Sequence, residues 1–117
     1  MAGVSNITIN QGSDLLLTIV VNRSDLPWDL TAVTVSGKVR ATFDAVSSLV
    51  DFTIAKTDAV NGEFTIALTS TQTAALVGPG GTTRTKVIGV YDIEISDAGI
   101  VTRILEGTVT LSQEATK

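Results

Sequence analysis

The chain has 117 residues, the length of one domain, and a chain of that size can bury a single hydrophobic core without disulfides. It contains no cysteine and no histidine, which excludes disulfides and cysteine nucleophiles and removes the commonest general base and metal ligands. With 8 basic and 12 acidic residues the net charge is −4, so we expect no broad positive face and no nucleic-acid partner.

The chain also lacks the features of a membrane or secreted protein. Residues 1–6 contain no positive charge followed by an apolar run, so we predict no signal peptide and synthesis in a cytoplasm. The longest strongly apolar stretch, residues 15–21, is far shorter than the ~20 residues that span a bilayer, and we expect no membrane partner. Mean hydropathy is nevertheless +0.36 and only 17% of residues are charged, which indicates a partly neutral exterior of the kind that other subunits cover.

The predicted elements in the first half of the chain are strands. Ile7 and Ile9 mark a short strand that ends in a turn, and residues 14–21 form a second strand that is apolar on both faces. A loop follows at residues 22–27. Residues 33–43 then alternate strictly between apolar or small side chains and polar ones, a period of two that predicts a strand with one buried face.

The second half of the chain continues the pattern. Strands are predicted at residues 49–54 and 63–68, with a turn at Asn61-Gly62 between them, and Thr69 or Ser70 can cap one or two helical turns that end at Leu76. After a surface loop at 77–83, strands 86–95 and 100–111 flank a tight turn at 96–99, and a bulge near Glu106-Gly107 reconciles the phases of the last strand.

About seven strands with regularly spaced turns predict an all-β, two-sheet antiparallel sandwich with at most one short helix. One buried face of each strand supplies the core. The residues that we expect between the two sheets are Val35, Val39, Phe43, Phe52, Phe64, Ile66, Tyr91 and Ile93.

No arrangement of residues predicts catalysis, so we expect no enzyme, no cofactor and no metal site. The carboxylates are scattered without the spacing of a calcium loop. Asp92 and Glu94 share one strand face as an acid pair does, but solvated strand carboxylates explain them more simply. Trp28 is interpreted as a lid on the core in preference to an interface anchor.

The first two strands suggest an interaction surface. The strand at Ile7 and Ile9 has no nearby charge or proline to protect an open edge, and Leu16 and Val20 make the second strand apolar on its other face. In the alternative interpretation the first strand pairs only within its own sheet and loops cover Leu16 and Val20. The candidate interface residues are Ile7, Ile9, Leu16, Val20 and Trp28.

The order of strands and turns resembles the small immunoglobulin-like domains of tailed-bacteriophage virions, such as the N-terminal domain of upper baseplate proteins and short cyanophage structural proteins. The segments that carry this resemblance are ITINQGSD at 7–14, PWDLT at 27–31, GEFTIALT at 62–69, VYDIEI at 90–95 and LEGTVTL at 105–111. Residues 78–85 depart from the family's usual short link before the Tyr-Asp strand.

The resemblance implies an immunoglobulin-like fold and a non-enzymatic building block of a tail, baseplate or fibre attachment. Its expected location is the virion, and its expected partners are other virion proteins and further copies of itself. A capsid decoration protein is the alternative within this class. A carbohydrate-binding module for host adsorption is the alternative from another class, although such modules usually expose several aromatics and aromatic residues make up only 4% of this chain.

Overall fold

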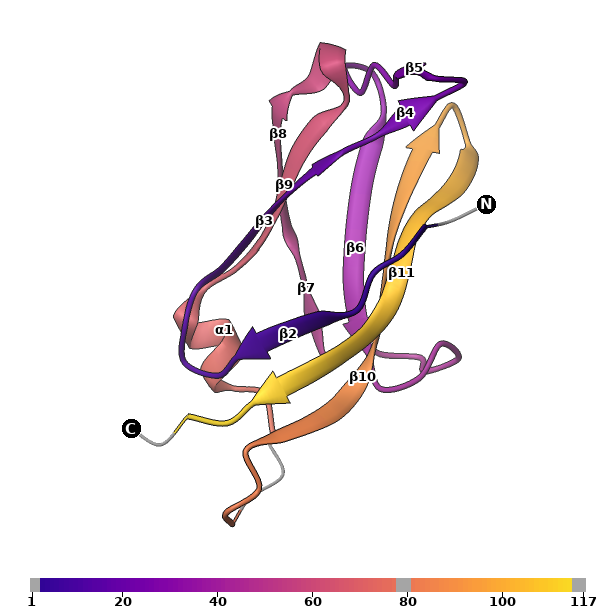
Figure 1. The fold of residues 1–117 in the computed structure, drawn as a ribbon. Coiled ribbons are helices and arrows are strands. Elements are labelled where there is room, and N and C mark those ends of the chain that lie inside the picture. The colour runs from indigo at the N-terminus through magenta and orange to yellow at the C-terminus, as the bar shows by residue number, and fades with distance from the viewer. Residues whose placement is uncertain (1–2, 78–80, 115–117) are drawn as a thin grey trace.

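The alternating strands fold into two β-sheets that pack face to face, as Figure 1 shows for the computed structural model, which describes residues 3–77 and 81–114. The larger sheet consists of β1 (Gly3–Val4), β2 (Ile7–Asn10), β6 (Thr34–Arg40), β7 (Val50–Asp51), β10 (Thr85–Asp97) and β11 (Ile100–Ser112). The smaller sheet consists of β3 (Leu15–Val20), β8 (Thr53–Asp58) and β9 (Glu63–Leu68). The short strands β4 (Asn22–Arg23) and β5 (Leu26–Pro27) pair with each other. The prediction of an all-β, two-sheet sandwich with at most one short helix is confirmed.

The strand order is β1-β11-β10-β6-β7 in the larger sheet, with β2 also on β11, and β3-β9-β8 in the smaller one. Neighbouring strands are antiparallel except β1 and β2, which both run parallel to β11. The long β10–β11 hairpin turns at Ala98 and Gly99, whose φ angles of 51° and 86° are left-handed. This confirms the tight turn predicted at 96–99 and matches the twist that two-residue hairpin turns require.

The core lies between the sheets and contains seven of the eight residues predicted for it. Every second residue of the central strands points inward, so Val39, Tyr91 and Ile93 are almost fully buried. Facing them from the smaller sheet are Phe64 and Ile66, which are completely buried. All the buried apolar residues belong to one cluster.

The exception is Phe43, which is 58% exposed, and the prediction that it belongs to the core is wrong. The strand ends at Arg40, because the chain turns immediately after it. The Thr42 hydroxyl donates to Asp44 Oδ1 over 2.7 Å, and Arg40 Nη1 donates to the carbonyl of Ala45 over 2.6 Å. These local bonds replace the ladder that would have continued the alternation to Phe43.

The predicted strand at 49–54 is also corrected, because it is two strands in different sheets. β7 pairs with β6, whereas β8 pairs with β9. Phe52 lies at the crossing, where its N–H donates to the Gly37 carbonyl over 3.0 Å. Its ring meets the edge of Tyr91 with centroids 6.0 Å apart, so the segment closes one side of the core while it changes sheets.

The bulge predicted in the last strand is present, but it lies at Ile104, two residues before Glu106, where the β10–β11 register shifts between Ile93 and Glu94. Gly107 has a different role. A Cβ there would lie 2.2 Å from the Ser5 carbonyl oxygen, so glycine allows the segment between β1 and β2 to approach β11. The Tyr91 hydroxyl donates to that same carbonyl over 2.5 Å.

The helical segments are short. Thr69 caps α1 (Ser70–Ala74) through a reciprocal pair of bonds with Gln72, as the predicted cap requires. In place of a two-residue turn at Asn61-Gly62, the 3₁₀ turn η1 (Ala59–Asn61) leads into Gly62, whose φ is 76°. Of the predicted loop at 77–83, residues 78–80 lie outside the described residues. Within residues 3–77 and 81–114, no helix is long and apolar enough to cross a bilayer.

Candidate interaction surface

The structure separates the five residues predicted to form an interface. The side chains of Ile9 and Trp28 lie in the core, with Ile9 fully buried against the smaller sheet, so neither can contact a neighbouring molecule as predicted. Ile9 is buried because β2 pairs with β11 and directs it inward. Ile7 is partly buried in the same way. Leu16 and Val20 are 67% and 59% exposed on β3, and no described loop covers them.

Trp28 serves as a lid on one end of the core, the role preferred from its sequence context. The Arg23 guanidinium lies 4.3 Å from the centre of its ring, an attractive cation–π contact. Its Nε1–H is buried and has no hydrogen-bond acceptor among the described residues. Next to it, the hydroxyl and N–H of Thr31 donate to Asp29, which lowers the pKa of that carboxyl and fixes the turn after the lid.

Leu16 and Val20 belong to a surface whose described residues are uncharged except at one end, where Glu63 pairs with Val20, and which we call the neutral face. It is the outer face of the smaller sheet, where pairing aligns Leu16 with Ala67 and Thr53, and Thr18 with Thr65 and Ala55. Glu63 lies at one margin, where it accepts a bond of 2.8 Å from Thr57. The neutral face consists of Leu16, Thr18, Val20, Thr53, Ala55, Thr65 and Ala67.

The outer face of the larger sheet has the opposite character. Pairing places Asp92 between Lys38 of β6 and Glu106 of β11. Arg103 forms ion pairs with both acids, at 3.4 Å to Asp92 and 3.7 Å to Glu106. Asp92 is therefore part of a surface charge network, which agrees with its interpretation as a solvated strand carboxylate. The two outer faces differ sharply in the cost of removing water from them.

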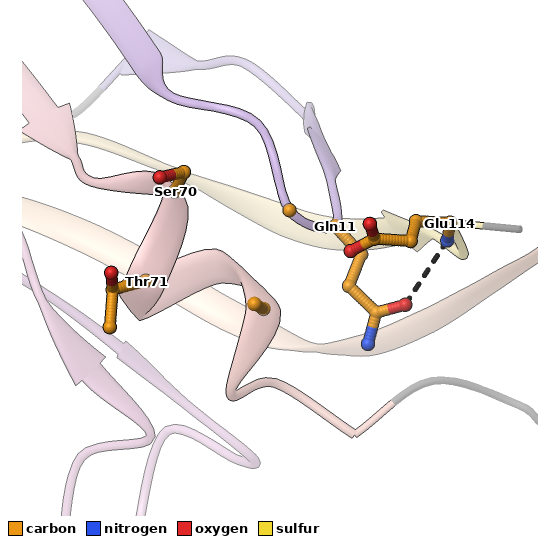
Figure 2. Close-up of a pocket in the computed structure, with 6 residues that line it drawn as sticks. Gln11, Ser70, Thr71 and Glu114 are labelled. Atoms are coloured by element: carbon orange, nitrogen blue, oxygen red, sulfur yellow. Dashed lines mark hydrogen bonds between the residues drawn. The ribbon is translucent and has the colours of Figure 1, made fainter. Parts of the chain in front are cut away.

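An open hollow of about 550 Å³ lies where α1 meets the turn after β2 (Figure 2). Ser70 and Thr71 line one side, and Gln11 and Glu114 line the other. Gln11 is engaged in structural bonds, because its amide donates to the Leu76 carbonyl over 2.9 Å and accepts from the N–H of Glu114 over 3.1 Å. Among residues 3–77 and 81–114, no three acidic side chains gather to hold a metal ion.

A buried threonine beneath this hollow was not singled out from the sequence. The Thr73 hydroxyl accepts from the N–H of Gly12 over 3.0 Å and donates to the carbonyl of Ser13 over 2.9 Å. It thereby joins α1 to the turn between the two sheets. The hollow thus lies where structural elements meet, and among the described residues that line it only Glu114 has a carboxylate.

The residues of the neutral face on β8 and β9 were likewise not predicted, although the alternation of inward and outward residues along these strands indicates them. Once Phe64 and Ile66 are assigned inward, the strand period places Thr65 and Ala67 outward beside Leu16.

Compared with protein-family models and with curated protein sequences, the chain matches none.

Proposed function

We propose that this protein is a non-enzymatic structural component of a tailed-bacteriophage virion, in the tail, baseplate or fibre attachment, and that it docks on other virion proteins through the neutral face. The observation that carries the proposal is the exposure of Leu16 and Val20 on a sheet face whose described residues are uncharged except at one end, where Glu63 pairs with Val20. The resemblance of the strand and turn pattern to phage immunoglobulin-like domains supports the choice of partner class.

The physical argument is one of desolvation. An interface core excludes water, so charged side chains are depleted there and apolar ones are enriched. Burying apolar surface contributes roughly 25 cal/mol per Å², whereas burying an unpaired charge is strongly unfavourable. The neutral face meets these conditions, and the outer face of the larger sheet, with Asp92, Glu106 and Arg103, does not.

The test is incorporation of a tagged copy into virions of the phage that encodes the chain. The double variant Leu16→Lys/Val20→Lys places two charges on the neutral face. The matched control is Ile100→Lys/Val101→Lys at the tip of the β10–β11 hairpin, where the exposed fractions of 71% and 58% are nearly the same. Circular dichroism first establishes that both variants are folded.

We expect the control to be incorporated like the wild type and the neutral-face variant to be lost from purified particles. Incorporation of the neutral-face variant at the wild-type level would refute the docking surface. Absence of the wild-type protein from purified particles would refute the assignment to a virion. Specific, saturable binding to one class of glycan on an array would favour the carbohydrate-binding alternative instead.

A further inference from the structure

We infer that the free edge of β3 pairs with β3 of a second copy of this chain, so that the two smaller sheets join into one continuous sheet. The inference deepens the proposed function, on which it rests, by naming one partner and the geometry of its contact.

Open strand edges attract other strands, and the other edges of the sandwich differ from that of β3. The part of β11 that β1 and β2 leave free, residues 100–104, contains Arg103 and the bulge at Ile104, and the part of β10 that β6 leaves free, residues 85–89, contains Lys86 and a bulge at Ile88. β8 carries Lys56 and Asp58 and has a register irregularity between Ala55 and Asp58. β1 and β7 are two residues long and β2 is four. Each of these edges is short, charged or irregular, which disfavours pairing with another chain.

The remaining part of the β6 edge is closed from within the molecule. Its outward carbonyls accept hydrogen bonds from the segment that crosses between the sheets. The donors are the N–H groups of Leu49 and Phe52, which bond to the carbonyls of Val39 and Gly37 in β6. The ammonium of Lys56 donates to the carbonyl of Val33, the residue just before β6.

β3 has none of these protections. It is six residues long, contains no charge, proline or glycine, and pairs without irregularity with β9. The N–H of Val21 donates to the carbonyl of Gly62 in the same register over 2.9 Å. Because hydrogen-bonded positions alternate along an antiparallel strand, the backbone groups of Leu16, Thr18 and Val20 point away from β9. No described residue bonds to them.

The core is also incomplete beside this edge. Leu15, Leu17 and Ile19 face the core but remain only partly buried. Their partners on β9 are almost fully buried, at 0% exposure for Phe64 and Ile66. These side chains are incompletely buried because β2 pairs with β11 in the larger sheet, so β3 has no neighbouring strand on the side away from β9. An added strand would cover the exposed flank of these three side chains.

A second copy of β3 is complementary to this edge. In an antiparallel pair centred on Thr18, the two Thr18 residues face each other and Leu16 faces Val20 of the second copy. All outward N–H and C=O groups are then satisfied in three hydrogen-bonded residue pairs. The apolar cross-strand pair occurs twice and extends the neutral face across the dimer.

Charge favours the same arrangement. Each copy has a net charge of −4, so two copies repel unless the contact is neutral or complementary. The paired strands contain no charge, so the contact itself brings no like charges together.

Sedimentation of the purified protein tests the dimer without any virion component. We expect the wild type to be dimeric and Thr18→Pro to be monomeric up to about 1 mM, because proline removes an outward N–H that β9 does not use. Thr18→Val retains this N–H and a β-branched side chain and should remain dimeric. A monomeric wild type at about 1 mM would overturn the inference.

Cysteine cross-linking tests the register even if Thr18→Pro fails to fold. The chain has no cysteine, so a single introduced thiol can form a disulfide only with another copy. Thr18→Cys should be oxidised to a covalent dimer at least tenfold faster than Thr53→Cys, which lies on the same face at the protected edge. Equal rates for the two variants would refute the pairing.

The two proposals fail separately. A monomeric protein that is still incorporated through the neutral face leaves the proposed function intact and removes the β3 pairing. A dimer that cross-links through Thr18→Cys but is absent from particles leaves the pairing intact and removes the proposed function.

Discussion

The substitution Gly62→Ala tests how the 3₁₀ turn, β3 and the Trp28 segment are joined. Gly62 has a left-handed φ of 76°, and its carbonyl accepts from the N–H of Val21 over 2.9 Å. The carbonyl of Val21 in turn accepts from the N–H of Trp28 over 3.0 Å. A Cβ on residue 62 would lie 2.4 Å from the Val21 oxygen and 3.0 Å from the Trp28 oxygen.

Two effects add at this position. A left-handed conformation costs alanine about 1–2 kcal/mol, of which about 0.4–1 kcal/mol is recovered because alanine restricts the unfolded chain. The overlap with Val21 adds a second cost, because the carbonyl must move and its bond to Trp28 is strained or lost at about 1–3 kcal/mol in a buried site. The free energy of unfolding should therefore fall by about 3 kcal/mol, or about 12 °C in Tm at this chain length.

Gly99→Ala separates the two effects. Gly99 has a φ of 86°, but nothing lies within 4 Å of an added Cβ. Only the conformational cost remains, and Tm should fall by about 4 °C. Thermal and urea unfolding followed by circular dichroism and by the fluorescence of Trp28 measure both variants. Equal losses for Gly62→Ala and Gly99→Ala would show that the close approach to Val21 contributes nothing, and the reasoning would be refuted.

Three further substitutions test the core and its polar bonds. Tyr91→Phe removes the bond to the Ser5 carbonyl and should cost about 1 kcal/mol. Burial raises the pKa of the Tyr91 phenol, so the unfolded chain loses this proton at a lower pH than the folded protein. The free energy of unfolding of the wild type should therefore fall as the pH rises past about 10. Unfolding measured between about pH 9 and 11 should show this decline for the wild type and not for Tyr91→Phe. Thr73→Val leaves the N–H of Gly12 without its acceptor and should cost about 1–3 kcal/mol in urea unfolding, whereas an unchanged midpoint would contradict the joining role of Thr73. Val39→Asp puts an unpaired carboxylate at a fully buried position and should unfold the chain, and an unchanged circular dichroism spectrum would show that the assigned face of β6 is wrong.

The class of the fold is predictable from the sequence alone, because the period of two in the side chains is a local property of strands. So is the buried face of each long strand, as Val39 in β6 and Phe64 in β9 illustrate. The same alternation placed Leu16 and Val20 on the face of β3 opposite the core, while the alternative that loops cover them stayed open until the structure showed both exposed. The Thr69 cap was predictable too, since its bonds to Gln72 span only three residues.

Which sheet each strand joins depends on contacts between segments that are distant in the sequence. Nothing local distinguishes β2 pairing with β11 from β2 pairing with β3, yet this choice buries Ile9 and opens the edge of β3. The change of sheet at Phe52 depends in the same way on bonds to β6, which lies distant in the sequence. Strand pairing joins segments whose contacts are satisfied equally well by several partners, and the packing of the whole core selects among them.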